Sequence, residues 1–297
     1  MTASVRDIIA AAIAGILRDS PANRLDDFGG QPVFETALVG MADGDDPVFD
    51  ALHSAVGPAH LMPREILGTH SPANGRRVRV SVVAWALPFT KDVRLSNRGR
   101  EWPSELYSVA RNNGGALLHE IGLRLPEILK KERIASVVPA LTPEYNAFRD
   151  PERVFSSTWS ERHVAYAAGL GRFGLNGSLI TPRGANARLG SIVTDASPEG
   201  GVPDRGDHRA PCLESRGRVC GLCVENCPER AIGQGGLDKS RCNARRKAIQ
   251  ERSLEDYLGR FRLVPSPVVK AGKRDPGYSL GCAVCQAGVP CEDRDPF

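Results

Sequence analysis

The chain has 297 residues, with 41% hydrophobic and 25% charged residues and a net charge of +4 at pH 7. These values are typical of a globular protein long enough to bury a core and divide into two domains, and no apolar run is long enough to span a membrane. Basic clusters at residues 76–79, 130–133 and 245–247 lack interleaved aromatics, so they do not predict nucleic-acid binding; they would suit an acidic electron donor equally well.

The first element we expect is an amphipathic helix over residues 1–17, which Ser20-Pro21 would end. It has no basic leading segment or apolar stretch of the kind that directs export, so we expect a cytoplasmic protein. The next stretch, residues 26–46, is rich in glycine and aspartate and predicts loops.

Helix and strand patterns then alternate up to about residue 195. Alternating valines predict a strand over residues 77–87, and residues 134–138 predict a short buried strand. Residues 104–125 predict a helix weakened at Gly114-Gly115 and stopped by Pro126. A helix over residues 160–170 would have Ser160 as its N-cap, and residues 188–195 predict another strand. We therefore expect an α+β fold, with a mixed α/β core over residues 1–200 and a second domain over residues 201–297, joined near residues 197–211.

The run Gly169-Leu-Gly171-Arg-Phe-Gly174 matches the pattern G-x-G-x-x-G. A dinucleotide site needs this pattern after a strand and at the start of a helix, because the helix N-terminus binds the pyrophosphate. Here the pattern follows a predicted helix. We therefore expect a helix C-cap and a loop whose backbone packs closely on something flat.

All eight cysteines follow residue 211. The run Cys220-Gly-Leu-Cys223-Val-Glu-Asn-Cys227-Pro228 matches the core of the bacterial ferredoxin pattern, in which the cysteine before proline ligates a different cluster from the others. Eight thiolates make two sets of four, which predicts two [4Fe–4S] clusters. The spacing assigns Cys212, Cys220, Cys223 and Cys291 to the first cluster and Cys227, Cys242, Cys282 and Cys285 to the second.

Two other interpretations of the cysteines stay open. Paired Cys-x₂-Cys turns also form structural zinc sites with four cysteine ligands. A disulfide framework is the other alternative, although nothing in the sequence suggests export to an oxidising compartment.

Several segments together resemble the epoxyqueuosine reductases and the related reductive dehalogenases. They are Ser160-Glu-Arg-His-Val-Ala-Tyr-Ala-Ala-Gly-Leu-Gly171, Leu189-Gly-Ser-Ile-Val-Thr194, the cysteine region, Leu237-Asp-Lys-Ser-Arg-Cys242 and Tyr278-Ser-Leu-Gly-Cys282-Ala-Val-Cys285-Gln286. The resemblance runs from about residue 78 to residue 291. It implies a nitroreductase-like core that binds cobalamin without a histidine below the cobalt, followed by a ferredoxin-like domain with two clusters.

The resemblance also suggests candidate site residues. Trp159, the loop residues Gly171, Phe173 and Gly174, and the polar residues Asn176 and Ser178 are candidates for contact with the corrinoid. Tyr145 and His163 are candidate proton donors, although the residue types alone favour an ordinary structural or surface role for each. Electrons would come from a ferredoxin or flavodoxin.

The chain departs from the pattern of the epoxyqueuosine reductases in three places. Their catalytic aspartate would align with Phe155, which Ser156 and Ser157 follow. The helical-repeat extension of the tRNA enzymes would be missing, because the chain ends six residues after Cys291. Five residues separate Cys285 from Cys291 in place of the usual Cys-x₃-Cys-Pro. We therefore expect a small-molecule substrate and not tRNA.

Two functions follow from these observations. The first is a cobalamin-dependent iron–sulfur reductase that acts on a small substrate. The second is an iron–sulfur protein that transfers electrons to, or reductively activates, another protein without substrate chemistry of its own. A structural metal site or a nucleic-acid-associated module is the remaining class. A plain electron carrier would not need the long segment before the cysteines, which favours the reductase.

Overall fold

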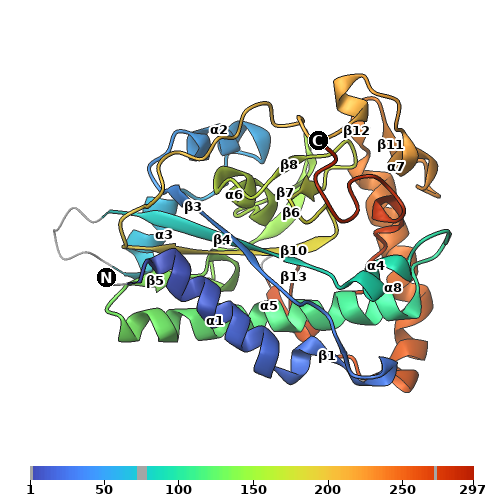
Figure 1. Cartoon of the computed structure of the whole chain (residues 1–297), viewed down its shortest axis with the longest axis horizontal. Coiled ribbons are helices and arrows are strands. Elements are labelled where there is room, and N and C mark those ends of the chain that lie inside the picture. The colour runs from blue at the N-terminus through green and yellow to red at the C-terminus, as the bar shows by residue number, and fades with distance from the viewer. Residues whose placement is uncertain (1–2, 72–78, 271–272) are drawn as a thin grey trace.

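The computed structural model describes residues 3–71, 79–270 and 273–297, which form an α+β structure (Figure 1). The α-helices are α1 (Val5–Asp19), α2 (Val48–Ala55), α3 (Pro63–His70), α4 (Lys91–Leu95), α5 (Glu105–Lys131), α6 (Glu161–Ala167), α7 (Leu222–Glu225) and α8 (Lys239–Arg260). The strands are β1 (Arg24–Leu25), β2 (Gln31–Pro32), β3 (Leu38–Asp43), β4 (Ser81–Pro88), β5 (Ser136–Val137), β6 (Ala147–Asp150), β7 (Val154–Ser157), β8 (Arg172–Phe173), β9 (Leu179–Ile180), β10 (Ala187–Thr194), β11 (Ile232–Gly233), β12 (Gly236–Leu237), β13 (Ser266–Lys270) and β14 (Lys273–Gly277).

A four-stranded sheet in the order β3-β4-β10-β5 forms the centre, and each neighbouring pair of strands is antiparallel. The long pair β4 and β10 is aligned from Ser81 opposite Thr194 to Pro88 opposite Ala187. Helices cover both faces: α1 and α5 lie on one side, and α2, α3 and α6 lie on the other (Figure 1). The sheet is therefore buried on both faces.

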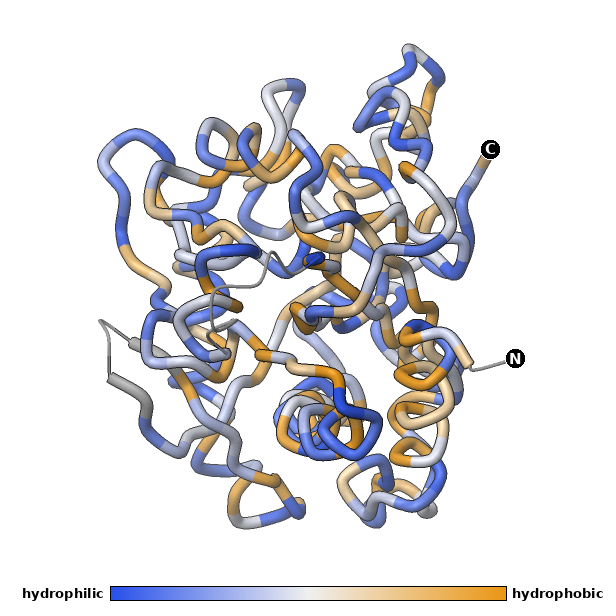
Figure 2. The backbone as a smooth tube through the Cα atoms, turned by 90° about the vertical axis from the view of Figure 1, so that its left-hand side faces the viewer, coloured by the Kyte–Doolittle hydropathy of each residue, from blue (hydrophilic) through white to orange (hydrophobic). Residues whose placement is uncertain are grey.

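Strand β4 explains how one apolar run serves two cores. Its side chains alternate between the faces of the sheet, as strand geometry requires. Val83, Trp85 and Leu87 pack with α1 and α5, whereas Val82, Ala84 and Ala86 pack with the helices on the other side. Figure 2 shows hydrophobic segments concentrated in the interior and hydrophilic segments in many of the outer loops.

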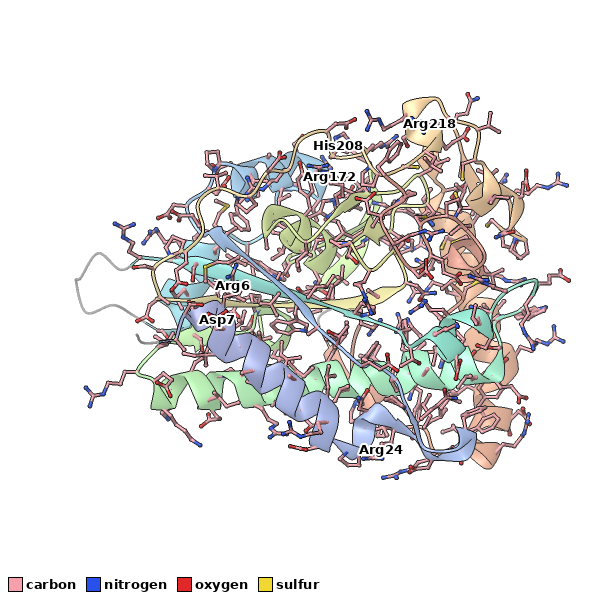
Figure 3. All side chains as sticks on the ribbon, viewed as in Figure 1. Arg6, Asp7, Arg24, Arg172, His208 and Arg218 are labelled. Carbon is pink, nitrogen blue, oxygen red and sulfur yellow. The ribbon has the colours of Figure 1, made fainter. Side chains whose placement is uncertain are left out.

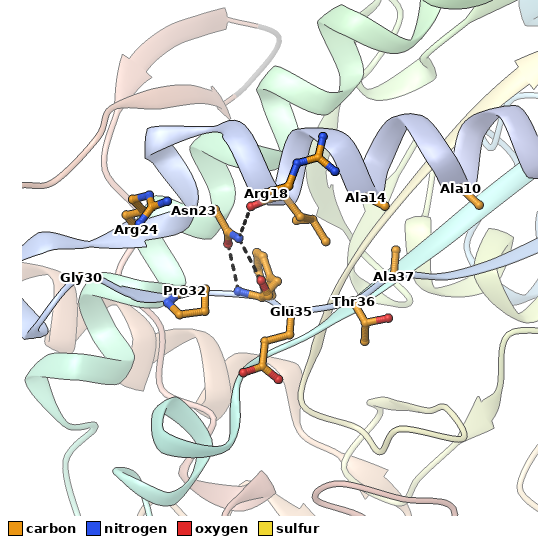
Figure 4. Close-up of a pocket in the computed structure, with 12 residues that line it drawn as sticks. Ala10, Ala14, Arg18, Asn23, Arg24, Gly30, Pro32, Glu35, Thr36 and Ala37 are labelled. Atoms are coloured by element: carbon orange, nitrogen blue, oxygen red, sulfur yellow. Dashed lines mark hydrogen bonds between the residues drawn. The ribbon is translucent and has the colours of Figure 1, made fainter.

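The segment after α1 is fixed by one buried amide. The side chain of Asn23 donates to the carbonyls of Leu17 and Phe34 and accepts from the backbone N–H of Phe34 (Figure 4). These three hydrogen bonds hold the end of α1 against the extended chain before β3. A cavity of about 400 Å³ lies between α1 and this extended segment, and it is lined by residues such as Ala14, Glu35 and Thr36.

The prediction of loops over residues 26–46 was wrong for β3, which pairs with β4 over its whole length. Glycine masked the strand signal, but Gly40 is required for packing. A Cβ at this position would lie 2.3 Å from the carbonyl oxygen of Ala168 and 2.9 Å from Cγ of Leu170. The strand therefore needs a glycine where α6 ends against the sheet.

Helix α5 also differs from the prediction, because it continues past Pro126 to Lys131. A proline inside a helix removes one backbone hydrogen bond and crowds the carbonyl of the residue four positions earlier, which is Gly122 here. Leu125 and Leu129 are fully buried in the core on either side of the proline. Their burial favours continuing the helix, and tertiary packing outweighs the local penalty.

The other elements agree with the expected pattern, with small shifts at their ends. Part of the predicted strand over residues 77–87 and the start of the first predicted helix lie outside the described residues. Ser160 occupies the N-cap position of α6, but its hydroxyl contacts Nδ1 of His163 (2.8 Å) and caps no backbone N–H. Gly169 follows α6 with φ +75°, as a helix C-cap requires.

The predicted connection, residues 197–211, runs along the surface of the core. The backbone N–H of Phe173 donates to the carbonyl of His208 (2.6 Å), and Nε of Arg172 donates to the carbonyl of Arg205 (2.6 Å). Arg172 and His208 lie close together in Figure 3. Arg205 itself pairs with Asp46 at 2.8 Å. The connection is thus bound to the core along its length.

The chain beyond residue 211 contributes to the main core as well as holding the cysteines. Ile249 and Tyr257 of α8 and Leu280 belong to the same buried cluster as α1 and α5. Asn112 and Asn113 of α5 form hydrogen bonds with the backbone of Arg262, Val264 and Ser279. The division at residue 200 stays a prediction. No described helix combines the length and apolar character needed to cross a bilayer.

Candidate functional site

Four of the thiols, which we call the outer thiol set, gather at one end of the molecule. They are Cys212, Cys220, Cys223 and Cys291, the group that spacing assigns to the first cluster, and they surround a small cavity of about 20 Å³. The backbone of Cys291 is held by the N–H of Ala185, which donates to its carbonyl at 2.8 Å. The last cysteine is therefore tied to the core.

The inner thiol set consists of Cys227, Cys242, Cys282 and Cys285, and it lines a much larger cavity of about 690 Å³. Cys242 lies in the first turn of α8, which Asp238 caps by accepting from the N–H groups of Ser240 and Arg241. The cap fixes where the helix begins, and hence where the thiol of Cys242 lies. The opposite walls of this cavity come from α5, α6 and β10.

The two Cys-x₂-Cys turns share one backbone feature. The residue after the first cysteine is left-handed in both: Gly221 has φ +61° and Ala283 has φ +49°. For alanine this conformation carries a steric cost, so packing must impose it. The left-handed residue folds each turn tightly, so that both thiols of the turn line one cavity.

Burial raises the pKa of several of these thiols, and the neighbouring thiols raise it further. The pKa rises to about 11 at Cys223 and to about 12 at Cys291, and it lies well above the ordinary value at Cys285. Crowded thiols resist becoming thiolates unless positive charge joins them, and metal ions supply such charge. The donor sets therefore fit metal clusters.

Among the described residues, no group of three or more histidine, cysteine or acidic side chains converges on one point as a single bound ion requires. A cubane cluster holds its four thiolates further apart than one ion does, because irons and sulfides lie between them. All eight cysteines are free thiols.

The large cavity has a cationic wall. Six of its lining residues are basic: Arg111, Arg162, Arg188, Lys239, Arg245 and Arg246. Only two lining residues are acidic, Glu161 and Glu229, and Glu229 pairs with Arg245 at 3.2 Å. Burial raises the pKa of Cys242 and Cys282, and the positive charges of nearby arginines oppose that rise. The wall therefore stabilises negative charge in the cavity and on the inner thiol set.

Glu161 is the acidic group of the cavity that has no basic partner among the described residues. Burial raises the pKa of its carboxyl to about 7, and a hydrogen bond from Oγ of Ser191 (2.7 Å) opposes that shift. Ser191 in turn accepts from Nε1 of Trp159 at 2.9 Å. The carboxyl group is therefore held in place and close to half-protonated at neutral pH.

The structure brings only some of the predicted cofactor residues to the large cavity. Asn176 and Ser178 line it, and Ser178 Oγ contacts the amide of Gln286. Trp159 is buried in the core, stacked on His60. Gly171 packs on the backbone of Ile180, where a Cβ would lie 2.2 Å from the carbonyl oxygen.

The remaining predicted residues surround the site. Gly174 lines the small cavity of the outer thiol set, and Phe173 packs on the ring of His163. Burial, reinforced by the charge of Arg162, lowers the pKa of His163 to about 3, so its ring is neutral and no acid at pH 7. Tyr145 is half-buried and packs against the core cluster that contains the buried residues of α6.

Sequence reasoning missed Glu161, Arg111 and Arg188 as cavity residues. Glu161 lies in the first turn of α6, where an acidic residue is favourable whether or not it faces a cavity. Arg111 lies within a helix and Arg188 at the start of a strand, and no short motif links them. Arg111 and Arg188 come close together only in the folded chain, where α5 packs across β10.

The fold and the two thiol sets define an α+β protein whose core faces a cysteine-rich region across a large cavity. No family model matches the chain. An epoxyqueuosine reductase of Bacillus anthracis is 26% identical over 71% of this chain and 47% of its own length. That of Staphylococcus aureus is 38% identical over 51% of this chain and 34% of its own length. The chain is thus a distant homologue of the epoxyqueuosine reductases, and it spans about half or less of the length of these relatives.

Two solved structures resemble the chain at 19% identity. A Bacillus subtilis epoxyqueuosine reductase with its catalytic loop swung out of the active site matches with a TM-score of 0.44, over 88% of this chain and 62% of its own. An epoxyqueuosine reductase bound to a tRNA stem loop matches with a TM-score of 0.39, over 79% of this chain and 56% of its own.

Proposed function

We propose that this protein is an iron–sulfur reductase that passes electrons through two [4Fe–4S] clusters to a corrinoid, which reduces a small substrate. The observation that carries the proposal is that the inner thiol set opens onto a cavity of about 690 Å³ shared with the α/β core. A protein that only stored or relayed electrons would not need such a chamber beside one cluster.

An electron would reach the outer cluster first and the inner cluster second. The two thiol sets are close enough that Cys223 of the outer set raises the pKa of Cys285 of the inner set. The inner set alone lines the large cavity. This order agrees with a donor such as a ferredoxin or flavodoxin binding near the outer set.

The large cavity lies beside the inner thiol set, and its walls carry polar groups that suit the amide groups of a corrinoid. Asn176 and Ser178 would hold the amide groups at its edge, and no histidine is among the residues found to line this cavity. When bound, the corrinoid supplies a strongly reducing cobalt centre for the hard step of the reaction. Half-buried aromatic and aliphatic side chains in the wall, including Phe155 and Leu189, would help to exclude water.

Glu161 is our candidate for the proton donor. A carboxyl group with a pKa near 7 is half-protonated at neutral pH, which suits a general acid. Ser191 orients the carboxyl by donating to its Oε2 atom. Phe155 lines the cavity at the position where the resemblance expects an aspartate. In this chain the product would therefore take its proton from Glu161 and not from that position.

The same phenylalanine favours the second candidate, an electron-transfer or reductive-activation protein without substrate chemistry. A chain without the expected acid could still reduce a partner protein through its clusters. Our prediction that tRNA is not the substrate stays a prediction; a turnover assay with an epoxyqueuosine-containing tRNA stem loop would test it.

The deciding experiment is anaerobic reconstitution followed by iron and sulfide analysis and titration with cobalamin, read by visible and EPR spectra. The reductase predicts about eight irons per chain and a five-coordinate cobalt(II) signal. Eight irons without cobalamin uptake would leave the electron-transfer protein. Zinc without sulfide would contradict both candidates.

A further inference from the structure

Two arginines from distant parts of the sequence meet in the wall of the large cavity. Arg111 lies one helical turn after Tyr107 and one turn before Gly115, so the three residues share a face of α5. Nη2 of Arg188, from β10, lies 3.4 Å from the position that a Cβ on Gly115 would take. The guanidinium group of Arg188 therefore reaches α5 one turn beyond Arg111, and both arginines line the cavity.

Both guanidinium groups have buried N–H groups without a partner. Nη1 of Arg111 and Nε of Arg188 are inaccessible to solvent and form no hydrogen bond within the described structure. Burial lowers the pKa of Arg188 to about 10 and lowers that of Arg111 well below its ordinary value; the charge of Arg188 lowers it further. Buried N–H donors without acceptors are costly, and such donors are rare unless something binds them.

No carboxylate in the cavity wall neutralises these two charges. Of the two acidic lining residues, Glu229 pairs with Arg245, and Glu161 accepts from Ser191. Within the described ranges, neither Arg111 nor Arg188 forms an ion pair. On the contrary, Arg246 lowers the pKa of both through charge repulsion. The cavity thus holds uncompensated positive charge at one place.

We propose that Arg111 and Arg188 form an anion-binding subsite, which takes a carboxylate or phosphate group of a molecule bound in the large cavity. A guanidinium group offers several N–H donors in a fixed plane, which suits the oxygens of such anions. The subsite deepens the proposed function, on which its role in catalysis rests, because it places an anionic group of the substrate or of the corrinoid beside the inner thiol set.

The anionic group has two possible sources. It can belong to a small substrate, or it can be the phosphodiester in the nucleotide loop of cobalamin. The negative charge of the inner cluster is a different explanation for the two arginines, because Arg111 packs on Gly281 next to Cys282. The experiments below separate these three cases.

The first experiment measures thermal unfolding of the reconstituted protein under anaerobic conditions, in phosphate, acetate or chloride at equal ionic strength. We expect phosphate or acetate to raise the Tm of the wild type in a saturable way. Arg111→Met and Arg188→Met should weaken this binding by about ten- to a hundredfold, since each removes charge-assisted hydrogen bonds.

The matched control is Arg124→Met, on the same helix α5, where the arginine is exposed and paired with Glu120. It should leave anion binding unchanged. In chloride, the two cavity variants should unfold at the same temperature as the wild type or higher, because methionine removes an uncompensated buried charge. A purely structural role predicts the opposite, a lower Tm in chloride and no dependence on the anion, and would overturn the proposal.

The second experiment titrates the same variants with cobalamin and with cobinamide, which lacks the phosphodiester. If the two variants bind cobalamin more weakly but cobinamide as well as the wild type does, the subsite holds the corrinoid phosphate. Weaker binding of phosphate and acetate, with both corrinoids unaffected, assigns it to the substrate. Unchanged anion and corrinoid binding with a shifted cluster potential would show that the arginines serve only the cluster, and would overturn the proposal.

None of these measurements requires turnover. A protein that binds phosphate through Arg111 and Arg188 but takes up neither corrinoid would keep the anion subsite and contradict the proposed reductase. A protein that takes up cobalamin, but binds neither cobalamin nor phosphate through the two arginines, would support the proposed reductase and contradict the anion subsite.

Discussion

Glu161 is a residue whose protonation connects stability with chemistry. Its folded pKa of about 7 lies above the ordinary value of 4.5, so the folded protein binds a proton that the unfolded chain releases. The proton therefore stabilises the fold fully below about pH 4.5, and this stabilisation is lost as the pH rises through 7.

Replacing Glu161 with glutamine should remove this pH dependence. We expect Glu161→Gln to gain stability over the wild type as the pH rises from 5 to 8, on the order of 3 kcal/mol at the upper end. Urea unfolding across this pH range measures the gain. The exposed Glu127→Gln on α5 is the control and should show no such trend.

The same variant tests the proposed acid. Glutamine cannot donate a proton, so a reaction that uses Glu161 should slow by about a hundredfold or more. The binding of cobalamin should stay unchanged. Full activity in Glu161→Gln would show that another group protonates the product.

The protonation of His163 has the opposite effect on stability from that of Glu161. Burial lowers its pKa to about 3, so the folded ring stays neutral while the unfolded chain takes up a proton below about pH 6.5. Stability should therefore fall as the pH drops below 6.5 towards 3. We expect His163→Gln to lose about 1 kcal/mol less than the wild type between pH 7.5 and 5.5. The exposed His208→Gln should follow the wild type in the same unfolding series.

At the level of elements, the close contact of β3 with α6 is the most sensitive junction near the site. Gly40→Ala would place a methyl group against the carbonyl of Ala168, and backbone cannot move as easily as a side chain. We expect a loss of about 1–3 kcal/mol in the free energy of unfolding. Gly68→Ala in α3, where nothing lies within 4 Å, should instead gain about 0.5–1 kcal/mol.

The elements show where sequence patterns suffice and where they fail. Strand β4 and helix α1 were predictable because their apolar periods match their packing. Strand β3 was missed, since Gly40 weakens a local strand signal while meeting a contact that only the folded chain creates. Helix α5 passes Pro126 because the burial of Leu125 and Leu129 outweighs a local rule.

The candidate site likewise has one part that the sequence predicts and one part that it does not. The thiols could be sorted into two sets because ligand spacing is a local property of the sequence. That each set holds a cluster stays a prediction. The cationic wall could not be predicted, because Arg111 and Arg188 are brought together by the crossing of α5 and β10.

For the whole molecule, the interleaving of the two thiol sets makes a sharp prediction about cluster loss. Cys291→Ser should leave about four irons per chain, held by the inner set, together with its EPR signal. Cys285→Ser should likewise leave about four irons, but held by the outer set. Loss of all iron in either variant would show that the clusters do not form independently.

The position of the final ligands also bears on how the protein matures. The inner thiol set needs Cys282 and Cys285, and the outer set needs Cys291, whose carbonyl is bound by Ala185 of the core. With this assignment, the inner cluster cannot be completed on a nascent chain before Cys285 has been made, nor the outer cluster before Cys291. Insertion of iron would then come after the synthesis of the whole central sheet and of the helices that cover it.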